Sequence, residues 1–202
     1  MGYIKDRDSY ISFLKRYLSP ERFVHSLEVE RESIALAKRY GVSLEKASIA
    51  GLLHDCAKGF SNEELINLAK RYNLPLSSYD LLSPQILHAP VGAIFAREYF
   101  GINDGEIIRA ISVHTTGDKD MNLLDKIVFI ADYVEYYRNF PGVTHIRELL
   151  KKDIDSAIIF AFNLTVGYVM RNNGVIHPKT IEAWNSILIS KGGEKIFNEV
   201  YS

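Results

Sequence analysis

Histidine and aspartate side chains interrupt apolar segments at three places in this 202-residue chain. His54 and Asp55 are adjacent at the end of one such segment, His25 lies within a helical pattern, and Asp132 ends an apolar run. A lone ionised carboxylate is costly to bury unless a cation or hydrogen bonds compensate it. Imidazole and carboxylate donors together suit iron, manganese, zinc or nickel. The combination therefore predicts a divalent metal site, although a lone histidine on a helix is more often an ordinary core residue.

Two further histidines, His88 and His114, lie at expected helix ends or breaks. They could bind a second metal ion that shares Asp55. Alternatively, they could donate hydrogen bonds to phosphate oxygens and protonate a leaving group. Lys58 lies about one helical turn after His54-Asp55, where it could contact a phosphate or simply complement a helix dipole. The sequence leaves these alternatives open.

The composition is that of a folded globular protein. Hydrophobic residues make up 47%, charged residues 24%, and the formal net charge is -1, so nucleic-acid polymers and anionic membranes are not the expected partners. The single cysteine, Cys56, excludes an internal disulfide and a zinc site made of thiolates, and we interpret it as a small core residue. No apolar run approaches the roughly 20 residues of a membrane span. We therefore expect a soluble, cytoplasmic protein.

Helix start and stop residues dominate the chain, whereas strand patterns are scarce. Ser19-Pro20 and Gly41 predict one helix between them, and Ser43 opens the segment that ends at His54-Asp55. Expected starts at Ser61, Ser83 and Asn103, a break at Pro90 just after His88, and helices over 123–136, 153–172 and 178–191 complete the pattern. The sequence thus predicts an all-α protein with a single domain over residues 1–202.

Five segments around these residues resemble the YqeK family of HD-domain phosphohydrolases. They are RFVHSLEV (22–29), AGLLHDCAK (50–58), LHAPVG (87–92), AISVHTTG (110–117) and IADYVE (130–135). The resemblance extends from about Ser9 to Trp184. One departure follows the last segment, where Tyr136 and Tyr137 replace the proline that commonly follows the glutamate in the family. This change leaves the backbone path to Arg138 open.

The resemblance implies an HD-domain helical bundle that splits diadenosine tetraphosphate symmetrically into two ADP. It implies a metal, most often iron, held by His25, His54, Asp55 and Asp132. One or two ions are expected, with His88 and His114 as possible ligands of the second. It assigns catalytic roles to Asp55, Lys58, His88 and His114. It places around the nucleotide Arg22, His88, His114, Thr115, Asp132, Arg138, Gly174, Val175, Ile176 and His177.

The expected reaction is the attack of a metal-activated water on a central phosphorus, with ADP as the leaving group. Two other functions are compatible with the same residues. One is a related HD-domain hydrolase acting on other nucleotides or on cyclic dinucleotides. The other is a non-catalytic module that senses nucleotides. The sequence is also compatible with a homodimer.

Overall fold

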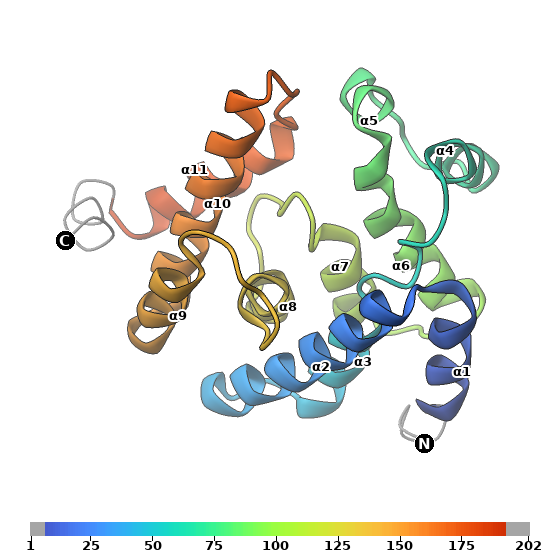
Figure 1. The fold of residues 1–202 in the computed structure, drawn as a ribbon, viewed down its shortest axis with the longest axis horizontal. Helices are drawn as coiled ribbons and strands as arrows, with labels where there is room; N and C mark the ends of the chain where they lie inside the picture. The colour runs from blue at the N-terminus through green and yellow to red at the C-terminus, as the bar shows by residue number, and fades with distance from the viewer. Residues whose placement is uncertain (1–6, 193–202) are drawn as a thin grey trace.

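A computed structural model describes residues 7–192, and all of its regular elements are helices within that range (Figure 1). In chain order they are α1 (Arg7–Tyr17), α2 (Pro20–Tyr40), α3 (Leu44–Leu53), α4 (Asn62–Arg71), α5 (Ser78–Leu82), the 3-10 helix η2 (Pro84–Leu87), α6 (His88–Glu98), α7 (Gly105–Val113), α8 (Leu123–Val134), α9 (Val143–Lys152), α10 (Ile154–Arg171) and α11 (Pro178–Ser190). The predicted all-α class is confirmed.

Helix α2 begins and ends where its sequence predicts. The Ser19 hydroxyl accepts a hydrogen bond from the Arg22 backbone N–H at 3.3 Å, and Pro20 occupies the first helical position. Gly41 ends the helix with a φ of 71°, a conformation that most side chains disfavour. These two boundaries place Arg22 and His25 in the first two turns of α2.

Several other boundaries differ from the predicted ones. Asp104, not Asn103, caps α7, because its carboxylate accepts hydrogen bonds from the Glu106 and Ile107 N–H groups. Helix α6 begins at His88 itself, with Pro90 as its third residue. Proline is tolerated there because the first N–H groups of a helix have no partner within it. Helices α1 and α5 were not predicted from the sequence.

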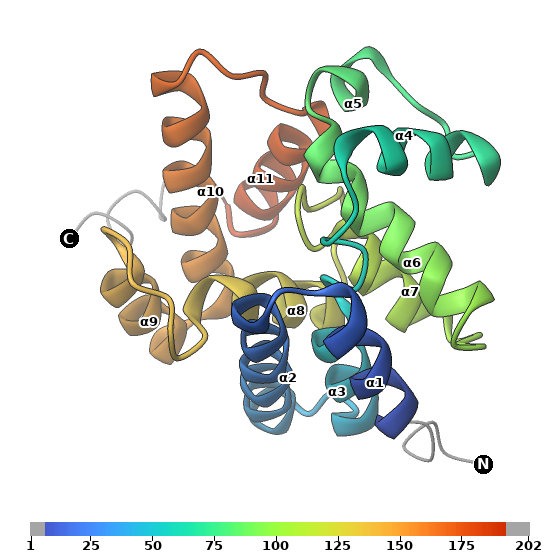
Figure 2. The same cartoon turned by 45° about the vertical axis from the view of Figure 1, so that its right-hand side comes forward.

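Helix α2 packs closely along α3 and also contacts α8. Gly51 of α3 makes this approach possible, since an added Cβ would lie 2.7 Å from the Ser33 hydroxyl and 3.1 Å from the Glu30 Cα. Helix α8 also contacts α7 and α10. It therefore lies between the helices that precede it and the group formed by α9, α10 and α11 (Figures 1 and 2). The main hydrophobic core includes buried residues of α1, α2, α3 and α6 through α11, whereas Leu65 and Ala69 of α4 and Leu87 of η2 belong to a second, smaller cluster.

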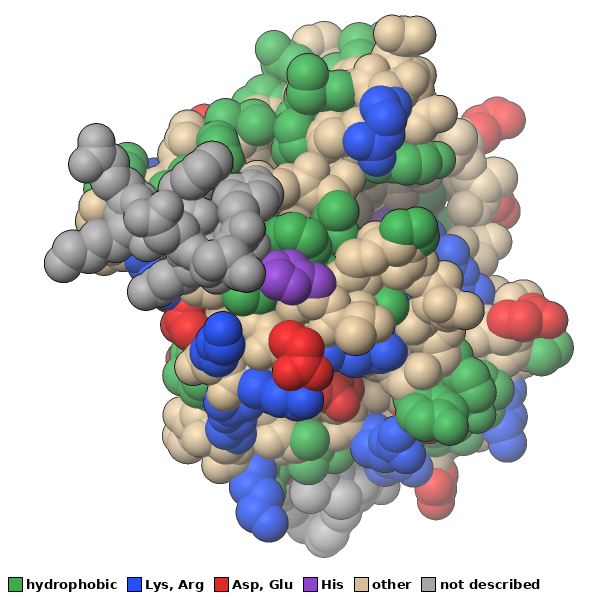
Figure 3. Space-filling model, turned by 60° about the vertical axis from the view of Figure 1, so that its left-hand side comes forward, with side chains coloured by type: hydrophobic (Ala, Val, Ile, Leu, Met, Phe, Trp, Pro, Cys, Tyr) green, Lys and Arg blue, Asp and Glu red, His purple; other side chains and the backbone are tan. Residues whose placement is uncertain are grey.

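One described helix, α10, is long and apolar enough to cross a membrane by length and composition alone. Seven of its residues are buried, among them Ile158 and Phe162, and the helix contacts α8, α9 and α11. Packing within the core therefore accounts for the apolar character of its first half, where all seven buried residues lie. On the face shown in Figure 3, basic and acidic side chains are interspersed, in keeping with the small net charge.

Candidate metal centre

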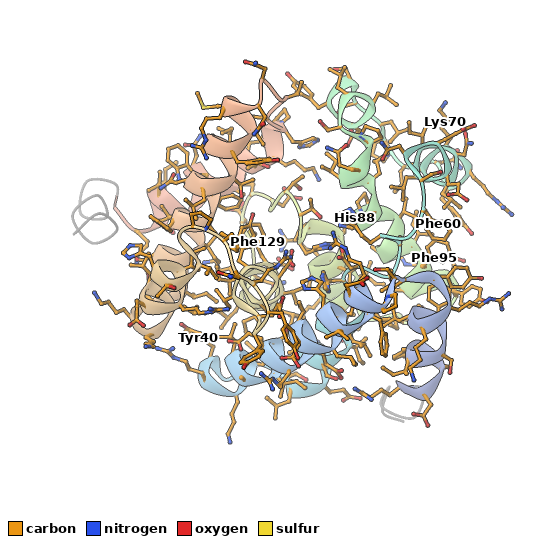
Figure 4. All side chains as sticks on the ribbon, viewed as in Figure 1. Tyr40, Phe60, Lys70, His88, Phe95 and Phe129 are labelled. Atoms are coloured by element: carbon orange, nitrogen blue, oxygen red, sulfur yellow. The ribbon has the colours of Figure 1, made fainter. Side chains whose placement is uncertain are left out.

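The ends of several helices bring the histidines and aspartates together. His54 and Asp55 follow the last residue of α3, His88 is the first residue of α6, and His114 follows α7. His25 reaches the same place from within α2. His88 lies near the middle of the molecule in Figure 4, and all five of these side chains are buried.

Asp55 is the central residue of this cluster. Its Oδ1 lies 3.0 Å from the His88 Nε2 and 3.5 Å from the His114 Nε2. Its Oδ2 lies 3.7 Å from the His54 Nε2 and 4.0 Å from the His25 Nε2. The donor atoms therefore form two groups that share Asp55, each with its atoms within 4.8 Å of one another. We call them the His25 group (His25, His54, Asp55) and the His88 group (Asp55, His88, His114).

Backbone carbonyls orient three of the four imidazoles. The Nδ1 atoms pair with carbonyl oxygens as follows: His54 with Gly51 at 2.7 Å, His88 with Gln85 at 2.5 Å, and His114 with Ile111 at 2.7 Å. A carbonyl oxygen only accepts hydrogen bonds, so each Nδ1 carries the proton. In a neutral imidazole, the Nε2 facing Asp55 then presents a lone pair, as a metal ligand must.

Two observations test whether a divalent cation fits these donors. The His54 Nε2 is buried and has no hydrogen-bond partner. The His88 and His114 Nε2 atoms are 3.1 Å apart, so two neutral imidazoles would face each other with lone pairs. A cation between the imidazoles and Asp55 would satisfy these atoms and neutralise the buried carboxylate. The residues fit a divalent metal.

A buried carboxylate orients the fourth imidazole. The His25 Nδ1 lies 3.3 Å from the Glu135 Oε1, and Glu135 is only 3% exposed. Glu135 ends the motif that contains Asp132, but no role for it was predicted from the sequence. A histidine that donates its Nδ1–H to a carboxylate and directs its Nε2 towards a metal is a recurrent arrangement in metalloproteins.

Asp132 borders the His25 group rather than joining it in this geometry. Its Oδ1 lies 3.0 Å from the His25 Nε2, and the same oxygen forms an ion pair with Arg138. The Arg138 Nε also donates a hydrogen bond to the Asp132 carbonyl at 2.7 Å. Arg138 therefore reaches the cluster despite the departure at Tyr136 and Tyr137.

The electrostatic environment keeps both aspartates ionised. Burial opposes the ionisation of Asp55, but the neighbouring histidines outweigh it and lower the pKa of Asp55 well below its usual value. Burial likewise opposes the ionisation of Asp132, whereas His25 and Arg138 lower its pKa. Burial lowers the pKa of His54 to about 3, so this imidazole is neutral at physiological pH.

Cationic and hydroxyl groups surround the donors. Arg22 contacts the Asp55 Oδ2 with its Nη1 at 3.1 Å, and the Lys58 Nζ lies 3.2 Å from the His88 Nδ1. Burial lowers the pKa of Lys58. The Thr115 hydroxyl lies 3.2 Å from the Nε2 atoms of both His88 and His114. These groups form the positive and polar rim that a phosphate ligand would require.

The structure places the remaining residues of interest outside the cluster. His177 caps α11, lies 3.5 Å from the Asp80 carboxylate and contacts the Tyr79 ring. The preceding residues Gly174 and Val175 are exposed, and Ile176 is partly buried. Cys56 is fully buried in the core, and burial raises the pKa of its thiol, which suits a packing role.

A helical bundle whose His, His-Asp and Asp side chains line one buried site has the architecture of an HD-domain hydrolase. In agreement, a family model described as HD domain matches residues 22–137, and the chain belongs to this family, in its YqeK-type branch. That branch is represented by proteins named symmetrical bis(5′-nucleosyl)-tetraphosphatase. The one from Halalkalibacterium halodurans is 37% identical over 92% of this chain and 99% of its own.

Two further relatives extend the comparison. The Bacillus subtilis protein of the same name is 35% identical over 89% of this chain and 96% of its own length. A crystal structure from Clostridium acetobutylicum is described as a predicted HD superfamily hydrolase involved in NAD metabolism. It superposes with a TM-score of 0.89 at 38% identity, covering 92% of this chain and 97% of the other.

Proposed function

We propose that this chain is a metal-dependent hydrolase that splits diadenosine tetraphosphate, and related dinucleoside polyphosphates, symmetrically into nucleoside diphosphates. The observation that carries the proposal is the pair of donor groups sharing Asp55 beneath a rim of Arg22, Lys58 and Arg138. The names of the full-length relatives support the substrate. The free, buried Cys56 is compatible with a cytoplasmic setting.

We assign the metal to His25, His54, Asp55 and Asp132, with iron as the expected ion and manganese, zinc or nickel as alternatives. With the ion bound, the Asp132 carboxylate would contact the ion in place of Arg138. When bound, a divalent cation lowers the pKa of water and offsets phosphate charge. The Nδ1–H groups of His88 and His114 are held by carbonyls, which favours a ligand role for their Nε2 atoms over a donor role.

The side chains around the donors would perform the remaining tasks. Arg22 and Arg138 would bind phosphate oxygens, and their guanidinium groups suit contacts with two oxygens at once. Lys58 would neutralise charge that develops on the phosphate chain, and the Thr115 hydroxyl would donate a hydrogen bond to it. We retain Gly174, Val175, Ile176 and His177 as proposed contacts for the nucleotide.

Product identity tests this proposal. The metal-loaded protein is incubated with diadenosine tetraphosphate, and the products are separated by chromatography. Two equivalents of ADP support symmetrical cleavage. AMP with ATP would assign a different cleavage position, turnover of only other nucleotides would assign a different HD-domain hydrolase, and binding without turnover would assign a sensing module. An Asp132→Ala variant that keeps both its metal and its activity would contradict the assigned ligand set.

A further inference from the structure

A cavity of about 710 Å³ opens beside the His25 group. It lies between the first turns of α2 and the segment that follows α8, and we call it the α2 cavity. Its lining residues are Pro20, Glu21, Arg22, Val24, His25, Glu135, Tyr137, Arg138, Asn139 and Phe140. Its volume lies within the usual range for small-molecule sites. Because His25 belongs both to this lining and to the metal-ligand group, the cavity adjoins the metal site directly.

The lining of the α2 cavity has a charged end and an apolar end. Arg22 and Arg138 pair with the metal-site aspartates and so mark the end nearest the cluster. Val24 and Tyr137 belong to the apolar end. Their exposed fractions are 41% and 63%, and neither residue contributes to the hydrophobic core. Phe140 is partly buried and packs against the core. Cations beside an apolar and aromatic wall match the phosphates and base of a nucleotide.

A second cavity adjoins the His88 group. It has a volume of about 560 Å³, and its lining includes Leu87 and Ala89, which flank His88, together with Thr116, which follows Thr115. One cavity is thus associated with each of the two donor groups that share Asp55. A ligand with two nucleosides joined by a phosphate chain has the same two-ended form.

We infer that the α2 cavity binds one nucleoside of the dinucleotide, with its base against Tyr137 and Phe140 and its phosphates on Arg22 and Arg138. This inference rests on the proposed function. It adds a recognition site for one half of the substrate. If the cavity beside the His88 group held the other nucleoside, the reacting centre would lie between the two, as symmetrical cleavage requires.

A substitution at Tyr137 tests the inference in the full-length, metal-loaded protein. Removing an aromatic group that stacks on a base typically weakens binding by about ten-fold or more. We expect Tyr137→Ala to raise the KM for diadenosine tetraphosphate about ten-fold, with a smaller effect on kcat. Tyr137→Phe retains the ring and should keep the KM of the unmodified protein. Tyr168→Ala serves as a matched control, because Tyr168 is 64% exposed, much like Tyr137, and lies outside the α2 cavity.

Inorganic tripolyphosphate separates contacts to the base from contacts to the phosphates, because it carries a phosphate chain without a base. Its inhibition constant should be the same for Tyr137→Ala and the unmodified protein. Calorimetry with a methylene-bridged, non-hydrolysable analogue of the substrate should show the same ten-fold loss of affinity as the KM.

An unchanged KM in Tyr137→Ala, or an equal loss with tripolyphosphate, would overturn the inference while leaving the proposed function intact. Failure of the unmodified protein to cleave diadenosine tetraphosphate would instead overturn the proposed function, and the inference with it.

Discussion

Replacing Glu135 by Gln should weaken metal binding without unfolding the protein. Glu135 is 3% exposed and contacts the His25 Nδ1, so solvent screens this contact very little. Loss of a partner that orients a metal-binding histidine typically costs 10–100-fold in affinity or activity, roughly 1.4–2.8 kcal/mol. The separation of 3.3 Å is longer than a strong charge-assisted hydrogen bond. We therefore expect a loss of about ten-fold, at the lower end of this range.

The assay is a competition titration of Mn²⁺ between the protein and a chelator of known affinity, with thermal unfolding measured in parallel. Glu98→Gln is the matched control, because it makes the same chemical change at an exposed position on α6. Equal metal affinity in Glu135→Gln and the unmodified protein would refute the role assigned to Glu135. A loss shared by the control would show that the effect is not local.

Three further predictions concern the fold and the rim of the site. Gly51→Ala should destabilise the protein by about 1–3 kcal/mol in chemical unfolding, because its Cβ would collide with Ser33, whereas Gly105→Ala has open space and should not destabilise it. Asp104→Ala should cost about 1 kcal/mol at pH 7. Slight burial opposes the ionisation of Asp104, but its hydrogen bonds lower its pKa, so the difference between the variant and the unmodified protein should shrink as the pH falls below about 4. Lys58→Met should lower kcat about 100-fold in steady-state assays with an unchanged melting temperature, and full activity would exclude a role for Lys58 in charge stabilisation.

Local sequence patterns predicted several of the helices that begin with a side-chain cap. Ser19, Ser43 and Ser61 each accept a hydrogen bond from the first turn of the helix they precede. By contrast, α5 was missed although Ser77 and Asp80 form a capping box at its start, because its five residues are too few to show a helical pattern. The start predicted at Asn103 is one residue early, because the Asp104 side chain caps α7.

The site could be predicted only in part, because its geometry depends on contacts between distant residues. Residue types and order pointed to His25, His54, Asp55 and Asp132, but the central position of Asp55 arises from the packing of α2, α3, α6 and α7. Glu135 was missed because its contact with His25 joins residues 110 positions apart. No local pattern encodes such a contact. The α2 cavity likewise requires the fold, since two separate segments form its walls.

The most direct test of the metal centre is elemental analysis of the protein and of an Asp55→Asn variant, both purified without oxygen from matched cultures. Asp55 belongs to both donor groups, and asparagine keeps its size while removing its charge. We predict at least one equivalent of a divalent transition metal per chain in the unmodified protein, and its loss in the variant together with hydrolysis. An Asp55→Asn protein that retains the full metal content and turnover would contradict the account.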